Sequence, residues 1–121
     1  MYQKKTLVLG ASENPARYSN MAIKRLLLHG HPVVAVGRKD GKAHGVEIHP
    51  GLPEHEEIDT VTMYLNPQNQ RSYYNYILSL KPRRIIFNPG AENPELETLA
   101  SEQGIQTLDA CTLVMLGTGQ Y

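Results

Sequence analysis

Short, mostly apolar runs recur along the chain and predict β-strands that are covered on both faces. They span residues 6–9, 32–36, 60–65, 83–87 and 105–108, and they lack the strict alternation of a half-exposed strand. A further short run at 46–48 lies within a turn-rich, irregular segment between residues 38 and 59.

Between these runs, apolar residues recur at the three- and four-residue spacing of an amphipathic helix. Ala22, Ile23, Leu26 and Leu27 form one such face. Capping residues and helix stops mark three helices: Ser19 or Asn20 to Gly30, Asn66-Pro67 to Pro82, and Asn93-Pro94 to Gly104. We expect a short helix or a turn in the tail after residue 110.

Strands that alternate with helices predict an α/β fold. We expect a doubly wound, mostly parallel sheet of about five strands with helices on both faces, formed by one domain over residues 1–121. In such a sheet, the loops that follow the strands converge on one edge, where ligands bind. The residues after each strand are therefore the candidates for a binding site.

Composition narrows the class of protein. Of the 121 residues, 40% are hydrophobic and 20% are charged, which is typical of a folded globular domain. Twelve basic residues balance twelve acidic ones, so net charge gives no reason to expect nucleic acid or an anionic membrane as partner. No apolar run approaches the roughly 20 residues that span a bilayer, and residues 1–5 do not resemble a signal peptide. The single cysteine excludes an internal disulfide, so we expect a cytoplasmic protein.

The loop after the first strand is the first candidate site. Gly10-Ala11-Ser12-Glu13-Asn14-Pro15 leads through small and polar residues to Ser19 and Asn20, where a helix is predicted to begin. Unpaired N–H groups and a partial positive charge at a helix start favour an anion such as phosphate. Only the first glycine of the G-x-G-x-x-G dinucleotide fingerprint is present in this loop.

The end of the second strand reads Val36-Gly37-Arg38-Lys39. These residues indicate which kind of nucleotide the site would bind. An NAD site places an acidic residue here to hold the ribose diol. Arg38 and Lys39 would instead attract a phosphate, unless the pair is simply a solvated part of the loop. NAD is therefore disfavoured, and nucleotides with an extra ribose phosphate, NADP or coenzyme A, remain.

Four of the eight prolines follow an asparagine, and all four pairs lie in loops after predicted strands. Helix starts account well for Asn66-Pro67 and Asn93-Pro94. Asn88-Pro89-Gly90 directly follows a strand and precedes the next cap. We therefore expect a rigid turn there, with an exposed asparagine amide that contacts a ligand.

Several of these segments together carry a resemblance that covers nearly the whole chain. They are Gly10-Ala11-Ser12 with Asn14-Pro15, the loop with Arg38-Lys39, Ile85-Ile86-Phe87-Asn88-Pro89-Gly90 with Glu92-Asn93-Pro94, and Ala110-Cys111-Thr112. The chain resembles the single-domain CoA-binding protein family, which is similar to the N-terminal CoA-binding domain of the succinyl-CoA synthetase alpha subunit.

The resemblance implies a Rossmann-like fold with the CoA nucleotide across the carboxyl edge of the sheet. Carried over by position, it implies phosphate contacts at Gly10, Ala11 and Ser12, the adenosine phosphate at Val36, Gly37, Arg38 and Lys39, flanking contacts at Leu65, Asn66 and Pro67, and a far wall at Asn88, Pro89 and Gly90. Asn14, Ser19 and Asn20 complete the expected set.

Two departures from the synthetase domain limit what the resemblance implies. The first loop is bulkier and contains Glu13, which is unfavourable beside a polyphosphate unless it points outward or pairs with Arg17. The second domain, with its phosphorylated histidine, and the partner subunit are missing. The resemblance therefore implies binding without ligase chemistry.

The sequence contains no recognisable catalytic set. His29-x-His31 lies at a helix end and is better explained as a surface feature than as a metal site, and Cys111 as a small buried hydrophobe. We expect a sensor, carrier or regulator that binds CoA or an acyl-CoA and uses no metal. The alternatives are a subunit of an NADP-binding oxidoreductase and an interaction module with a decayed site. Whether the chain forms a homodimer or has another protein partner is left open.

Overall fold

A computed structural model describes residues 3–121, in which seven strands form one sheet with the order β3-β4-β2-β1-β5-β6-β7. Residues 1 and 2 of the expected domain lie outside the described residues. The strands are β1 (Thr6–Leu9), β2 (Val33–Val36), β3 (Gly41–Ala43), β4 (Val46–His49), β5 (Thr60–Met63), β6 (Arg84–Phe87) and β7 (Gln106–Asp109). All neighbours are parallel except β3 and β4, so the α/β class and the mostly parallel sheet are confirmed.

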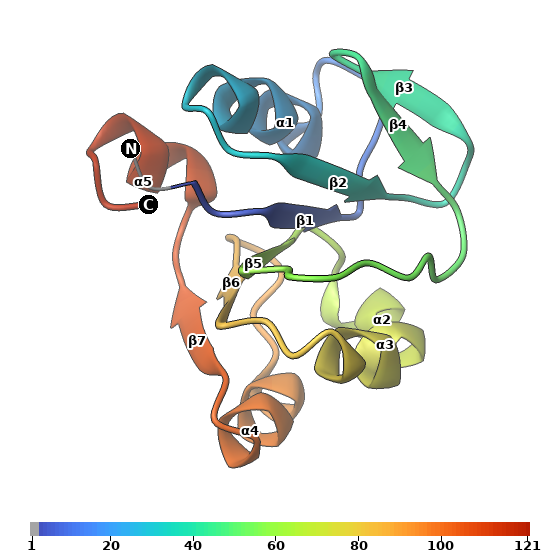
Figure 1. The fold of residues 1–121 in the computed structure, drawn as a ribbon. Coiled ribbons are helices and arrows are strands. Elements are labelled where there is room, and N and C mark those ends of the chain that lie inside the picture. Colours follow the sequence, from blue (N-terminus) through green and yellow to red (C-terminus); the bar gives the residue numbers. More distant parts are fainter. Residues whose placement is uncertain (1–2) are drawn as a thin grey trace.

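Helices cover both faces of this sheet (Figure 1). They are α1 (Tyr18–Leu28), α2 (Pro67–Gln70), the 3-10 turn η1 (Arg71–Tyr73), α3 (Tyr74–Ser79), α4 (Pro94–Glu102) and α5 (Thr112–Gly117). Helices α1 and α5 lie on one face, and α2, α3 and α4 lie on the other (Figure 1). No helix among the described residues has both the length and the apolar character needed to cross a bilayer.

Side chains that alternate along the central strand build two separate cores. Leu7 and Leu9 point to the face that α3 and α4 cover, whereas Val8 points to the face that α1 and α5 cover. All three side chains are fully buried. A strand buried on both faces has no reason to alternate apolar with polar residues, which is why an unbroken apolar run predicts it correctly.

The hairpin of β3 and β4 makes the predicted count of about five strands too low. Strand β4 corresponds to the short run at 46–48, but β3 gives no strand signal because it contains only Gly41, Lys42 and Ala43. The two strands are joined by His44 and Gly45, both with positive φ (53° and 84°). Such a two-residue turn matches the twist of paired strands, and it is most often built from Asn-Gly rather than His-Gly.

Helix α1 begins earlier than the sequence predicts. Arg17 is the N-cap residue, with no side-chain capping bond, so Ser19 and Asn20 are not caps but buried residues of the first turn. The Asn20 side-chain oxygen, which a cap would need as acceptor, instead lies 2.8 Å from His44 Nε2, and its Nδ2 donates to Ser12 O in the preceding loop. Leu27, expected on the apolar face, is partly exposed. By contrast, the predicted caps at Asn66 and Asn93 and the short tail helix are confirmed.

Candidate functional site

The point at which the sheet reverses its winding lies between β1 and β5. Strand β1 is followed in the chain by β2 on one side, and β5 by β6 on the other. The loops after β1 and β5 therefore diverge and open a crevice, where ligands bind in open α/β sheets. Gly10, which has a φ of 96°, stands at this point, and a Cβ there would lie 3.2 Å from the backbone nitrogen of Leu65. The close approach and the positive φ together favour glycine.

The loop after β1 is held mainly by its own hydrogen bonds. The N–H groups of Gly10 and Ala11 both donate to Val36 O at 2.9 Å. Ser12 Oγ accepts the N–H of Asn14, whose Oδ1 in turn accepts the N–H two residues further on. The backbone N–H groups of Gly10 and Ala11 are thus already used. Within residues 3–121, no partner engages the N–H of Ser12, which leaves it free for an anion.

Buried Asn20 connects this loop to the β3–β4 hairpin. Its Nδ2 donates to Ser12 O at 2.9 Å, and its Oδ1 lies 2.8 Å from His44 Nε2. Glu13 also reaches the hairpin, because its Oε2 accepts the N–H of Lys42 at 3.2 Å. Glu13 therefore pairs with the backbone of β3 rather than with Arg17. The contact of His44 with Asn20 is not predictable from the sequence, since it depends on the β3–β4 hairpin.

The loop after β2 lies directly against the loop after β1. A Cβ at Gly37 would come within 2.5 Å of Ala11 O and 2.9 Å of Ile48, so only glycine fits without a shift. Arg38 and Lys39 follow on the exposed surface, and nothing among the described residues pairs with their side chains. Two unpaired cations next to the first loop can bind a phosphate group.

A surface hollow of about 410 Å³ lies between these loops and the hairpin. Its lining mixes charges of both signs: Glu13, Asp40, Gly41, Lys42, Glu47, Ile48 and His49. The Glu47 carboxylate lies 3.8 Å from His49 Nε2.

The loop after β5 is linked to the loop after β6 by Gln70, a fully buried residue that the sequence did not single out. Its Nε2 donates to Leu65 O at 2.9 Å and to Ala91 O at 2.8 Å. Its Oε1 accepts a hydrogen bond from Asn93 Nδ2 at 2.9 Å. Asn66 caps α2 by accepting the N–H of Asn69, so its side chain serves the helix start. These bonds set the spacing of the two loops.

Asn88 is not the exposed amide that the sequence predicts. Only 3% of the residue is exposed, and its Nδ2 donates to Thr62 Oγ1 at 2.7 Å and to Met63 O at 2.9 Å. Its Oδ1 accepts the N–H of Thr112 at 2.9 Å. The side chain holds β5, β6 and the start of α5 together. Only Pro89 and Gly90 of this turn lie on the surface.

Comparison with known protein families shows which family the chain belongs to. Residues 4–117 match the model of a CoA binding domain. The chain belongs to this CoA-binding domain family. A search among curated proteins finds no match.

Solved structures of other proteins share this fold. An uncharacterized protein is 55% identical with a TM-score of 0.97, and the match covers 100% of both chains. A hypothetical protein from Pyrococcus horikoshii OT3 is 26% identical with a TM-score of 0.86, covering 95% of this chain and 82% of that one. A Thermus thermophilus protein, 24% identical, reaches a TM-score of 0.86 over 98% of this chain and 90% of that one. The expected Rossmann-like fold is confirmed.

The CoA-binding domain thus brings most of the predicted residues to one edge. Eleven of them end or follow the neighbouring strands β2, β1 and β5: Gly10, Ala11, Ser12, Asn14, Val36, Gly37, Arg38, Lys39, Leu65, Asn66 and Pro67. Asn20 and Asn88 also lie there but are buried and bonded to protein atoms, and Ser19 is buried in α1. Their expected ligand contacts stay predictions.

Two titratable side chains, Cys111 and Tyr64, lie near each other at the start of α5. Cys111 is the N-cap residue of α5, and burial raises the pKa of the nearby Tyr64 hydroxyl, which keeps it neutral. Residues 3–121 contain no group of three or more histidine, cysteine, aspartate or glutamate side chains placed to hold a metal ion.

Proposed function

We propose that this CoA-binding domain binds coenzyme A or an acyl-CoA along the carboxyl edge of its sheet. The phosphates would meet the free N–H of Ser12 and the start of α1, where the N–H groups of Tyr18 and Ser19 have no backbone partner within residues 3–121. The 3′-phosphate of the adenosine would lie against Arg38 and Lys39. The protein would act in the cytoplasm as a sensor, carrier or regulator without ligase chemistry.

The observation that carries this proposal is the unpaired Arg38-Lys39 pair beside the contact between Gly37 and Ala11. Both side chains are exposed and lack partners among residues 3–121. Family membership supports CoA over other phosphorylated nucleotides. An extra phosphate on the ribose gives these two cations a partner that NAD does not offer.

Calorimetric titration with CoA, 3′-dephospho-CoA, NADP and NAD tests the proposal. The double variant R38A/K39A should weaken CoA by roughly 1–3 kcal/mol, because charge-assisted hydrogen bonds to the phosphate are lost. It should change 3′-dephospho-CoA binding much less. The matched control is K24A/R25A, which removes the same charge from exposed positions of α1.

Three outcomes would overturn the proposal. Binding of NADP without CoA would favour an oxidoreductase subunit instead. Absence of binding and of any thermal shift with all four nucleotides would favour an interaction module. Equal losses for CoA and 3′-dephospho-CoA in R38A/K39A would remove the assigned role of the cations.

A further inference from the structure

A second surface hollow, of about 520 Å³, lies between the start of α2 and the start of α4. Its walls include the pyrrolidine rings of Pro67 and Pro94 and the aromatic ring of Tyr74. Arg71 and Glu95 also line it. The hollow therefore offers apolar walls with a few polar groups, and it suits an uncharged segment of a ligand that has both apolar and polar atoms.

The hollow lies on the opposite side of the crevice from Arg38 and Lys39. It follows β5 and β6, whereas the two cations follow β2, and the sheet order is β2-β1-β5-β6. Strands in a sheet are about 4.8 Å apart, so the β1–β2 loops and the β5–β6 loops are separated by roughly 10 Å. The pantetheine arm of CoA, a chain of about ten bonds, reaches roughly 10 Å or more on the scale of extended peptide.

The polar groups of the hollow converge on a carboxylate. Asn93 Nδ2 donates to Tyr74 Oη at 2.8 Å, and Tyr74 Oη donates to Glu95 Oε1 at 2.9 Å. Burial raises the pKa of Tyr74, so its hydroxyl keeps the proton that it donates. The Arg71 side chain is 77% exposed and reaches Glu95 only at 4.0 Å. Glu95, itself 58% exposed, is thus the charged group of the hollow that the Tyr74 hydroxyl holds in place.

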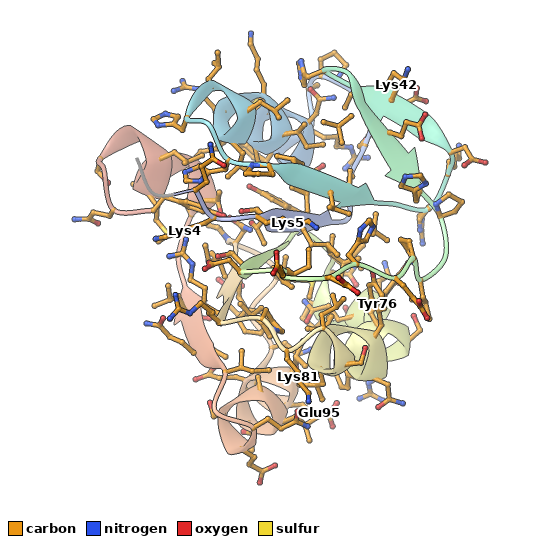
Figure 2. The ribbon with its side chains drawn as sticks, viewed as in Figure 1. Lys4, Lys5, Lys42, Tyr76, Lys81 and Glu95 are labelled. Atoms are coloured by element: carbon orange, nitrogen blue, oxygen red, sulfur yellow. The ribbon has the colours of Figure 1, made fainter. Side chains whose placement is uncertain are left out.

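Both ends of the carboxyl edge carry acidic and basic side chains, but only the β2 end presents two adjacent cations, Arg38 and Lys39. Glu92 lies close to the hollow along the chain and accepts the N–H of Gly90 at 2.9 Å, so two carboxylates follow β6. The cations Arg38 and Lys39 follow β2. Figure 2 shows Lys42 and Glu95 at opposite ends of the molecule. A ligand with phosphates at one end and an uncharged arm at the other is therefore oriented with its arm toward the hollow.

We propose that this hollow receives the uncharged pantetheine arm of CoA and the acyl group attached to it, and that Glu95 makes the site selective for uncharged acyl groups over those that end in a carboxylate. The inference rests on the proposed binding of CoA. It names the class of acyl-CoA that the site accepts.

Butyryl-CoA and succinyl-CoA test this selectivity, because both acyl groups have four carbons and only one ends in a carboxylate. The wild-type protein should bind butyryl-CoA about three-fold more tightly, the factor that like charges about 6 Å apart produce in water. Substitution Glu95→Gln keeps an acceptor for Tyr74 and should bring the two affinities together. Added salt should reduce the wild-type preference, which a purely structural role of Glu95 would not explain.

Glu97→Gln is the matched control, since Glu97 is exposed in the same turn of α4 but does not line the hollow. It should leave the three-fold preference in place. A wild-type protein that binds succinyl-CoA as tightly as butyryl-CoA, or a preference unchanged by Glu95→Gln, overturns the inference. Binding of free CoA in the same titration would then still support the proposed function, whereas loss of all CoA binding would refute the proposed function itself.

Discussion

Replacement of Asn88 by alanine separates the structural role of this residue from the ligand contact that the sequence suggests. In Asn88→Ala, the N–H of Thr112 loses its acceptor, and Thr62 Oγ1 and Met63 O each lose a donor. Met63 O keeps the backbone N–H of residue 88, and Thr62 Oγ1 keeps the hydroxyl of Thr112 at 2.8 Å. Only the buried N–H of Thr112 is left without a partner.

The size of the effect follows from these contacts. An orphaned buried N–H costs about 1–3 kcal/mol, and each of the other two lost bonds about 0.5–1.5 kcal/mol. The free energy of unfolding should therefore fall by roughly 2–6 kcal/mol, a large part of the stability of a typical domain. A loss of about 3 kcal/mol lowers the urea midpoint by roughly 1–2 M at an m value of about 2 kcal/mol/M.

Urea unfolding followed by circular dichroism measures this midpoint. Asn75→Ala is the matched control, because Asn75 lies exposed on α3 and its substitution should change stability by less than about 0.5 kcal/mol. The reasoning would be refuted if Asn88→Ala unfolded at the same urea concentration as Asn75→Ala. A variant that kept full stability but lost CoA affinity would instead restore the exposed-amide hypothesis.

Two further predictions concern stability. Gly37→Ala should lower the free energy of unfolding by roughly 1–3 kcal/mol, since the new Cβ would lie 2.5 Å from Ala11 O. The control Gly117→Ala should be tolerated, because no atom lies within 4 Å of the Cβ that it adds. Equal urea midpoints for the two variants would contradict this prediction. Burial, and then the nearby Lys4 ammonium, lower the pKa of His31, whose Nδ1 accepts the Lys4 N–H at 3.0 Å. The unfolded chain therefore binds the proton first, and stability should fall as the pH drops below about 6.5, less steeply in His31→Asn. Identical pH profiles of the two proteins would refute the role of His31.

The sheet could be predicted because its signals are local. Each buried strand is a short apolar run, and the helices after β5 and β6 begin at Asn-Pro pairs that cap them. Strand β3 could not be found in this way. Gly41, Lys42 and Ala43 have weak strand preferences, and they form a strand only because β4 pairs with them.

The site was predicted less completely because burial depends on the whole fold. The apolar run before Asn88 correctly predicts that this residue directly follows a strand. Whether its amide faces solvent depends on α5, which follows in the chain more than twenty residues later. Glu13 similarly appeared unfavourable beside phosphates, since its partner, the N–H of Lys42, belongs to the hairpin that no local signal indicated.

The β3–β4 hairpin also has a consequence for association between molecules. A sheet that ended at β4 would offer a parallel edge with unpaired backbone groups, a surface on which further strands can add. The antiparallel strand β3 covers that edge, and as an outer strand of only three residues with an exposed lysine it discourages further pairing. Lys42 of the same strand donates its N–H to Glu13, and His44 of the following turn contacts Asn20. A substitution that loosens β3 should therefore increase aggregation and disturb the first loop at the same time.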